Sequence, residues 1–230
     1  MINDQAPKHI GYIVDGNRRW AKEHGLPTYE GHLAGYNAVQ EVVRASFEAG
    51  VEYVSAYVFS TENWKRSQDE VNRLMKLALR IAKTDINILL DNNVKVRVLG
   101  SRTGVDPQIL EAIDDIERRS VDNTAGTLAF CFNYGGQIEL ADAVKKMIQE
   151  GVSSDAVTPE LISQYLYAAD IPPIDLVVRT GGEQRISNFM LWRAAYSEFM
   201  FLNKYWPDMT KEDVATILKE YLERNRRFGG

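Results

Sequence analysis

The chain has 230 residues, of which 45% are hydrophobic and 26% charged, and its formal net charge at pH 7 is −5. These values are typical of a soluble globular protein with one large core. The negative charge argues against nucleic acid as a general partner, whereas a local basic site for an anionic ligand is compatible with it.

Short apolar runs alternate with amphipathic helical patterns along the chain. In chain order, the patterns predict a strand over His9–Val14, a helix over Leu33–Ala49, a strand over Val51–Phe59, a helix over Asp69–Asp91, a strand over Val94–Leu99 and a helix over Pro107–Arg119. They continue with a strand over Thr127–Phe132, a helix over Gln137–Glu150, a short helix that ends before Pro172, a strand over Ile174–Val178, a helix over Phe189–Ala195, a strand over Phe199–Leu202, and a helix over Lys211–Arg226 capped by Asp208 or Thr210. This alternation predicts an α/β fold in which helices cover both faces of a mostly parallel sheet of about six strands. Without linkers or repeats, we expect a single domain over residues 1–230.

The sequence carries no sign of export or of membrane insertion. Cys131 is the only cysteine, so no disulfide forms within the monomer, and its place in the apolar run Leu128–Phe132 predicts a buried thiol in a reducing compartment. The first residues lack the basic and apolar regions of a signal peptide, and no apolar stretch approaches the ~20 residues that span a bilayer. We therefore expect a cytoplasmic protein.

Three polar clusters follow predicted strands, at the edge where parallel α/β sheets bind ligands. They are Asp15–Arg19, Ser60–Arg66 and Arg179–Ser187. Loops at this edge would bring carboxylates, arginines and hydroxyls together. The sequence therefore predicts a site for phosphate and metal.

The first cluster combines a tight turn with a helix that begins near Arg18. Backbone N–H groups at a helix start bind phosphate, Gly16 lets the backbone approach a ligand, and Arg19 adds a forked hydrogen-bond donor. Because a carboxylate repels phosphate, Asp15 is better explained as a ligand of Mg²⁺. A capped Asp-Gly turn with solvated arginines is the alternative.

The second cluster predicts a loop that binds a diphosphate and closes over an apolar ligand. The hydroxyl, amide, guanidinium and indole groups that suit this role belong to Ser60, Asn63, Arg66 and Trp64. The same segment also suits a capped entry into the next helix, with Ser67 as N-cap and Glu70 completing a capping box. Both interpretations are compatible.

The third cluster places Arg179 and Arg185 around a pair of glycines, with Ser187 directly after them. Paired arginines and a hydroxyl on a glycine-rich loop suit a second phosphorylated substrate, and a structural arginine network is the alternative. Glu198 could supply a second carboxylate for a metal or be a solvated charge. His32 could bind phosphate or cap the helix that follows it.

Eight motifs occur in order from His9 to Gly230. They are Asp15–Ala21, Gly31-His32 with Ala34-Gly35, Phe59–Arg66, Asn133–Gly136, Arg179–Asn188, Tyr196–Glu198, Trp206–Asp208 and Arg226–Gly229. In this order and spacing they resemble the cis-prenyltransferase family of undecaprenyl diphosphate synthase-like enzymes.

The resemblance implies a transferase that adds isopentenyl diphosphate to an allylic diphosphate and forms cis double bonds. It implies that Asp15 is catalytic and holds Mg²⁺ together with Glu198, and that Asn63 assists proton removal. The allylic diphosphate is expected to contact Gly16, Asn17, Arg18 and Arg19, and the isopentenyl diphosphate Arg179, Arg185 and Ser187. Further substrate contacts are expected from Trp20, His32, Ser60, Thr61, Glu62, Trp64, Arg66 and Ile186.

The resemblance also implies a homodimer in which Arg227 and Gly229 reach the partner's diphosphate site, together with peripheral membrane contact. Two departures from the family pattern stand out. Thr28 occupies a position where the family often has arginine, so one phosphate contact is expected to be missing. Gln184 replaces a histidine that is associated with magnesium in some members.

Large apolar residues on the predicted strands should line or support a product tunnel. They are Val58, Phe130 and Phe132. Their bulk leads us to expect a product of short or medium length rather than one near eleven isoprene units. Plain packing of the core is the alternative.

Three other functions are alternatives to this one. A non-catalytic partner subunit of the same fold would tend to lose the aspartate and arginine clusters, and this chain keeps both. Thr28 and the tunnel residues leave open an enzyme that joins isoprenoid units into branched or cyclic products, although Asn63 and the intact isopentenyl site argue against it. A nucleotide-binding protein is disfavoured because the chain lacks Gly-x-x-x-x-Gly-Lys-Ser/Thr and Gly-x-Gly-x-x-Gly.

Overall fold

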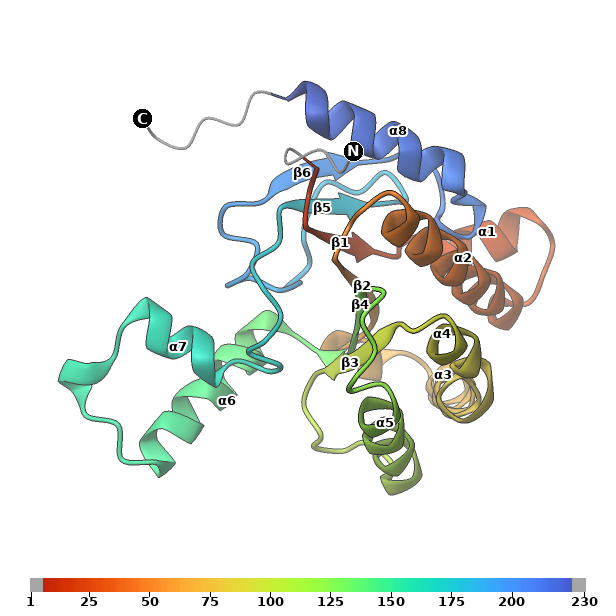
Figure 1. Ribbon diagram of the computed structural model, residues 1–230. Coiled ribbons are helices and arrows are strands. Elements are labelled where there is room, and N and C mark those ends of the chain that lie inside the picture. The colour runs from red at the N-terminus through yellow and green to blue at the C-terminus, as the bar shows by residue number, and fades with distance from the viewer. Residues whose placement is uncertain (1–5, 225–230) are drawn as a thin grey trace.

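A six-stranded parallel sheet forms the centre of the computed structural model, which describes residues 6–224 (Figure 1). The strands are β1 (His9–Ile13), β2 (Tyr53–Ser60), β3 (Lys95–Leu99), β4 (Thr127–Tyr134), β5 (Leu176–Arg179) and β6 (Glu198–Phe201). Their order across the sheet is β3-β4-β2-β1-β5-β6, and every neighbouring pair is parallel. The α/β fold expected from the sequence is confirmed.

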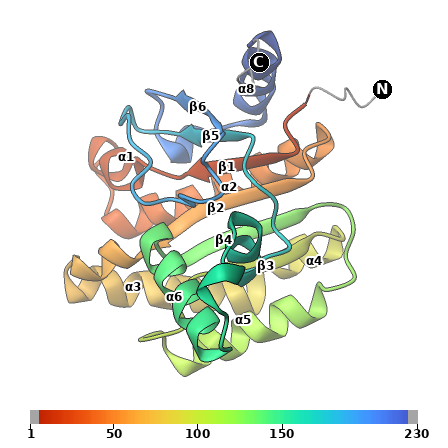
Figure 2. The same cartoon turned by 90° about the vertical axis from the view of Figure 1, so that its left-hand side faces the viewer.

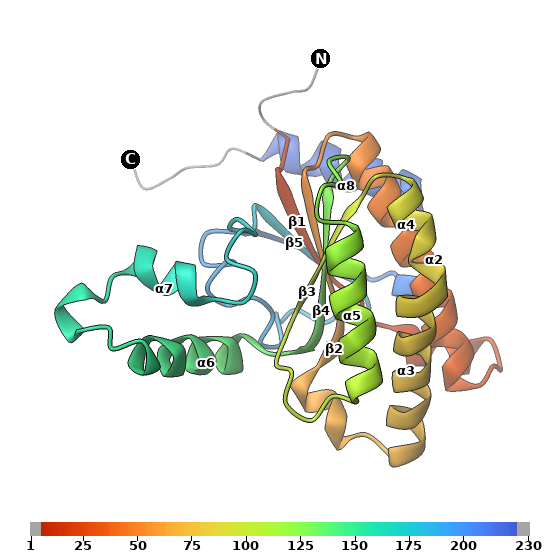
Figure 3. The same cartoon turned by 60° about the horizontal axis from the view of Figure 1, so that its bottom comes forward.

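Helices lie on both sides of this sheet. They are α1 (Asn17–Glu23), α2 (Thr28–Glu48), α3 (Gln68–Arg80), α4 (Asn87–Asp91), α5 (Pro107–Arg119), α6 (Gly136–Gln149), α7 (Pro159–Tyr165) and α8 (Lys211–Glu223). The largest core cluster joins α2, α4, α5 and α8 to one face of the sheet. Figure 3 shows α6 and α7 on the opposite side of the sheet from α2–α5, projecting away from the strands, and in Figure 2 this side faces the viewer, with α6 in front. None of the described helices has the length and hydrophobicity needed to cross a membrane.

The predicted helix over Phe189–Ala195 is wrong, because this segment forms turns. Met190 has φ of 38°, and Asn188, the residue before this segment, has φ of 65°; both values lie outside the right-handed helical region. Phe189, Met190 and Ala194 are nevertheless buried in the second core cluster. The apolar spacing that predicted a helix reflects an irregular segment that packs on the sheet.

The predicted helix over Asp69–Asp91 is interrupted. α3 ends at Arg80, a π-helical turn follows over Ile81–Asp85, and α4 begins at Asn87. A π-turn spaces its hydrogen bonds one residue wider than an α-helix, so it shifts the phase of the apolar face. Leu77 before the turn and Leu89 after it are both buried.

Two other helix ends differ from the prediction. α2 begins at Thr28 rather than Leu33, directly after the extended residue Pro27. Thr210, one of the two predicted caps, closes a capping box with Asp213 at the start of α8. α8 ends at Glu223, and the predicted end at Arg226 lies outside the described residues.

Candidate active site

The register of the sheet brings the first and third polar clusters together. Ile13 at the end of β1 pairs with Arg179 at the end of β5. Arg179 Nη2 donates a hydrogen bond to Asp15 Oδ2 at 2.8 Å, and Arg19 Nη2 lies 3.3 Å from Asp15 Oδ1. Burial raises the pKa of Asp15, but the bond and charge of Arg179, the Gly16 N–H and Arg19 outweigh it and hold this pKa below its usual value. Asp15 is therefore ionised at neutral pH.

Gly16 forms the turn between β1 and α1. Its φ of 107° lies in the left-handed region that favours glycine, and a Cβ there would lie 2.7 Å from Tyr205 Cδ1. Gly16 also occupies the N-cap position of α1, where no side chain caps the helix. The N-cap of α1 is therefore Gly16 and not Asp15, whose Oδ1 accepts a hydrogen bond from Gly16 N at 2.7 Å.

A polar cavity of about 720 Å³ opens beside this turn. Its wall contains seven of the predicted site residues, Asp15, Gly16, Asn17, Arg18, Arg19, His32 and Arg66. Lys22 and Thr28 also line it. Cationic side chains outnumber the single carboxylate, so the cavity suits an anion.

Glu70 is a site residue that the sequence prediction missed. Its Oε1 lies 3.0 Å from Arg66 Nη1, 3.6 Å from His32 Nε2 and 3.7 Å from Arg18 Nε. Burial and the charge of Arg66 lower the pKa of His32 while Glu70 opposes them, so the imidazole is neutral at pH 7. The spacing of Arg66 and Glu70 is a visible sequence signal, but the prediction assigned Glu70 to a capping box. Ser67 does cap α3, by accepting a hydrogen bond from Glu70 N.

The loop over 179–187 forms a second polar site beside Asp15. Arg179 Nη1 donates to Ser187 Oγ at 2.8 Å and to the carbonyl oxygen of Arg185, so Arg179 bridges Asp15 and Ser187. The Arg185 side chain is exposed and paired with Glu183 at 2.6 Å. Ile186 is partly buried.

The second polar cluster folds into a 3₁₀ helix over Thr61–Lys65, hereafter the Thr61–Lys65 turn, which the sequence did not predict. Ser60 N donates to Asn63 Oδ1 at 3.1 Å, as part of a capping box. Trp64 Nε1 donates to Asn133 Oδ1 at 2.7 Å. The turn is thus fixed from within and from a neighbouring strand end.

Trp20 and Glu198 lie outside the polar cavity, the loop over 179–187 and the Thr61–Lys65 turn. The Trp20 indole donates to Asp208 Oδ1 at 2.7 Å and does not line the cavity. Glu198 begins β6 opposite Leu176, three residues before the level of Arg179, a separation of about 10 Å along the strands. Glu198 is instead paired with Arg224 at 3.2 Å. Within one chain, Glu198 therefore stands away from the level of Arg179, and its role as a metal ligand stays a prediction.

The described residues contain no group of three or more His, Cys, Asp or Glu side chains that could hold a metal ion. Asp15 is the one carboxylate in the wall of the polar cavity. Arg227 and Gly229, predicted to reach a partner's site, lie outside the described residues.

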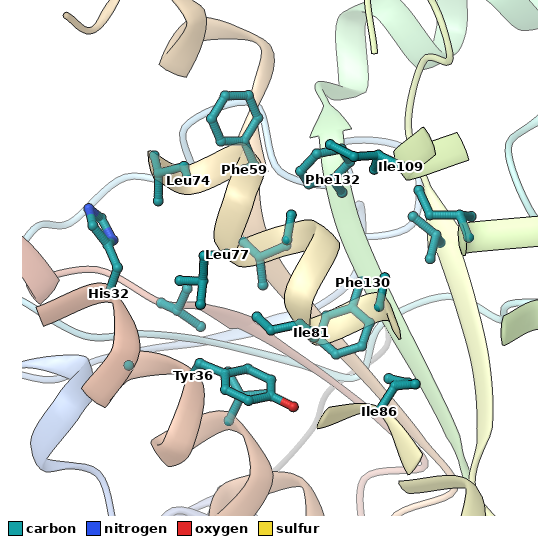
Figure 4. Close-up of a pocket in the computed structure, with 18 of the residues that line it drawn as sticks. His32, Tyr36, Phe59, Leu74, Leu77, Ile81, Ile86, Ile109, Phe130 and Phe132 are labelled. Atoms are coloured by element: carbon teal, nitrogen blue, oxygen red, sulfur yellow. The ribbon is translucent and has the colours of Figure 1, made fainter. Parts of the chain in front are cut away.

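An apolar cavity of about 140 Å³ adjoins the polar one (Figure 4). Val14, Asn17 and His32 line both cavities. The three residues predicted to line a product tunnel lie in its wall: Val58, Phe130 and Phe132. In Figure 4, His32 lies at one end of the cavity and Ile86 at the other.

Sequence comparison connects this architecture to known enzymes. Residues 13–229 match the family described as "Putative undecaprenyl diphosphate synthase". The chain is 43% identical to an isoprenyl transferase from Agrobacterium fabrum, over 97% of this chain and 92% of the relative. It is 42% identical to an isoprenyl transferase from Thermotoga maritima, over 97% of each chain.

Solved structures agree with the sequence comparison. A lavandulyl diphosphate synthase from Lavandula x intermedia, crystallised with dimethylallyl diphosphate, superposes with a TM-score of 0.94 at 28% identity, covering 99% of this chain and 100% of that one. A probable undecaprenyl diphosphate synthase from Campylobacter jejuni superposes with a TM-score of 0.82 at 28% identity, covering 97% and 99%. The chain therefore belongs to the undecaprenyl diphosphate synthase family of cis-prenyltransferases, enzymes that transfer isoprenyl groups.

Proposed function

We propose that this enzyme condenses isopentenyl diphosphate with an allylic prenyl diphosphate and forms a cis-polyprenyl diphosphate. One observation carries the proposal: the cationic cavity around Asp15 shares Val14, Asn17 and His32 with the apolar cavity. A ligand with a diphosphate at one end and a hydrocarbon chain at the other fits two adjoining cavities of these kinds.

We propose Mg²⁺ as the cofactor, held by Asp15 and by oxygens of the substrate diphosphate. Mg²⁺ commonly takes one or two carboxylates, with substrate phosphates and water completing its shell. The donor set fits this pattern, because Asp15 is ionised and partly exposed, and the buried Asn17 Oδ1 has no hydrogen-bond partner. When bound, the ion would neutralise charge on the departing diphosphate.

The side chains of the enzyme supply the remaining steps. Arg19 and Arg66 bind the allylic diphosphate, whose C–O bond breaks as the diphosphate leaves with the electron pair. Arg179 and Ser187 position isopentenyl diphosphate so that its double bond forms the new C–C bond. The amide of Asn63 then assists loss of the proton that yields the new double bond.

We also propose a homodimer in which Arg227 and Gly229 of one copy lie near the diphosphates of the other. The family resemblance supports this assignment. The lipid character of the product further supports peripheral membrane contact during its release.

The test is an assay with isopentenyl diphosphate and geranyl, farnesyl or geranylgeranyl diphosphate, with and without Mg²⁺. We expect turnover only with the metal. We expect Asp15→Ala to abolish turnover, because it removes the metal ligand and the partner of Arg179, while circular dichroism shows a folded protein. Asp114→Ala is the control, since Asp114 is an exposed carboxylate on α5 that pairs with Arg102. Near-normal activity of Asp15→Ala would contradict the mechanism.

Synthesis of a branched or cyclic isoprenoid diphosphate is the second candidate function, because the chain also superposes on a lavandulyl diphosphate synthase, with a TM-score of 0.94. Incubation with dimethylallyl diphosphate alone separates the two functions. We expect no product, because in the proposed mechanism Arg179 and Ser187 position isopentenyl diphosphate and not a second allylic diphosphate, and a product would favour the second function.

A further inference from the structure

Asn188 holds an unusual backbone conformation beside the second polar site. It has φ of 65° and follows Ser187, which has φ of 49°. Residues other than glycine adopt these angles rarely, with asparagine the most tolerant, and they persist where the surrounding structure fixes them, often at functional sites. Asn188 was not among the predicted substrate-binding residues.

Three polar groups of Asn188 bind two different segments. Its carbonyl oxygen accepts a hydrogen bond from Gly136 N at 2.7 Å, and its Oδ1 accepts one from Gln137 N at 2.9 Å. These two bonds satisfy N–H groups at the start of α6. The third group, Nδ2, donates to Glu62 Oε1 at 3.2 Å. Asn188 therefore connects the start of α6 to the Thr61–Lys65 turn.

Gly135 keeps open the space in which these segments meet. Its φ of −162° is one that any residue adopts, so the backbone does not require glycine here. A Cβ at this position would lie 2.7 Å from Asn188 Nδ2 and 2.9 Å from Thr61 Oγ1. Glycine is therefore required for the close approach of Asn188 and the turn.

The contacts on either side of Asn63 explain why this connection matters. Glu62 precedes Asn63 and is bound by Asn188, while Trp64 follows it and is bound by Asn133. On the other side of the connection, the residue before Asn188 is Ser187, which accepts the hydrogen bond from Arg179.

We propose that Asn188 is a positioning residue that fixes Asn63 relative to Ser187 by holding Glu62. The distance between Asn63, which assists proton removal, and Ser187, which binds the second diphosphate, then stays the same through each catalytic cycle. The kinetic consequence rests on the proposed function, whereas the hydrogen bond to Glu62 can be tested without it.

The discriminating variant is Asn188→Asp. It preserves side-chain size, and its carboxylate still accepts the bond from Gln137 N, but it cannot donate to Glu62 and repels it. We expect kcat/KM for isopentenyl diphosphate to fall about tenfold to hundredfold, the range for a lost hydrogen bond to a charged group. KM for the allylic diphosphate stays within about twofold, because the polar cavity around Arg18 and His32 is untouched. Amide hydrogen exchange accelerates over residues 61–66 and is unchanged over α6.

A second variant tests the contact directly. Adding Glu62→Gln to Asn188→Asp restores the hydrogen bond with donor and acceptor exchanged, because the new amide donates to the new carboxylate. We expect the double variant to recover most of the lost kcat/KM and the slow exchange of the turn. Such non-additivity is the signature of two residues in contact.

Asn93→Asp is the matched control. Asn93 also has a positive φ, 58°, and its Nδ2 donates to Thr124 Oγ1 at 3.0 Å, at the opposite end of the sheet, before β3. We expect it to leave the kinetics and the exchange of residues 61–66 unchanged.

Two outcomes would overturn the proposal. One is unchanged exchange over residues 61–66 in Asn188→Asp, or faster exchange confined to α6, which would leave Asn188 with a capping role alone. The other is a double variant that recovers nothing. Absence of turnover by the wild-type enzyme with every allylic primer would instead contradict the proposed function, and the exchange measurements would still decide whether Asn188 holds the turn.

Discussion

Glu70 sets the arrangement of cationic side chains around the polar cavity. It belongs to α3, whereas Arg18 and His32 belong to α1 and α2, so a single carboxylate joins three elements. Its side chain is only 14% exposed, and solvent therefore screens its charge less than it screens a surface ion pair. Without Glu70, the neighbouring guanidinium groups would repel one another.

Glu70→Gln is expected to lower the free energy of unfolding by about 1.5–3 kcal/mol, the range for lost hydrogen bonds to charged groups. Inorganic diphosphate should restore part of this loss, because it supplies negative charge beside the same arginines. The increase in Tm on adding diphosphate should therefore be larger for the variant than for the wild type. Urea unfolding measures the loss of free energy, and differential scanning fluorimetry measures the increase in Tm with diphosphate.

Glu48→Gln is the control for this experiment. Glu48 pairs with Arg44 at 4.0 Å in a pair whose side chains are about two-thirds exposed, and such pairs contribute little. A Tm increase with diphosphate that is equal in Glu70→Gln and in the wild type would show that Glu70 does not balance the cations of the cavity.

At the scale of elements, the strands could be predicted because a buried strand has a simple apolar pattern in the sequence. A strand buried on both faces reads as a continuous apolar run, as β4 does around Cys131. The same signal misled the prediction at Phe189–Ala195, since a buried loop also contains apolar residues at short spacing. The left-handed residues Ser187 and Asn188 carry no distinctive pattern, so the backbone there could not be predicted.

In the candidate site too, some residues could be predicted from the sequence and others could not. The polar clusters at strand ends were predicted because parallel strands share one edge, and Asp15 and Arg179 meet there. Sequence order does not reveal register, so it could not show that Glu198 pairs with Leu176 and not with Arg179; its role as a metal ligand stays a prediction. Glu70 was missed because its position after Ser67 suggested a helix cap, whereas its side chain contacts Arg18, His32 and Arg66 only once the chain is folded.

Phe130 is expected to limit the length of the product in the apolar cavity. Phe130 lies on β4 and in the cavity wall. Phe130→Ala removes the ring and enlarges the cavity, so we expect longer products than those of the wild type, at a stability cost of up to about 3–5 kcal/mol. Thin-layer separation of radiolabelled products measures the chain lengths.

Phe47→Ala is the control that tests whether a change in product length arises from the larger cavity or from the loss of a phenyl ring in general. Phe47 is partly buried against Gly126 and does not line the apolar cavity, so its removal should leave product length unchanged. Identical product lengths in Phe130→Ala and the wild type would assign Phe130 to core packing alone.

At the scale of the whole molecule, His9 connects two strands and a distant loop. His9 is fully buried in β1, its Nε2 shares a hydrogen bond with Ser55 Oγ at 2.8 Å, and its Nδ1 lies 2.9 Å from the carbonyl oxygen of Pro172. Because that carbonyl can only accept, Nδ1 carries the proton and Nε2 accepts from the hydroxyl. The neutral imidazole is therefore part of the folded core.

This burial predicts how stability depends on pH. Burial lowers the pKa of His9 from 6.5 to about 4, and Arg193 lowers it further, whereas the Pro172 carbonyl and Asp175 oppose the shift. The unfolded chain therefore binds a proton near pH 6.5 and the folded chain only near pH 4, so stability falls as pH drops through this interval. The full loss corresponds to about 3 kcal/mol.

Urea unfolding at several pH values between 6.5 and 4.5 measures this slope for the wild type and for His9→Gln. The variant loses its titrating group, so its free energy of unfolding should fall less steeply with decreasing pH, whatever its absolute stability. His24→Gln removes an exposed histidine and should keep the wild-type slope. If His9→Gln and the wild type had the same slope, acid sensitivity would arise elsewhere in the molecule, and the buried imidazole between β1 and β2 would not limit the stability of the fold.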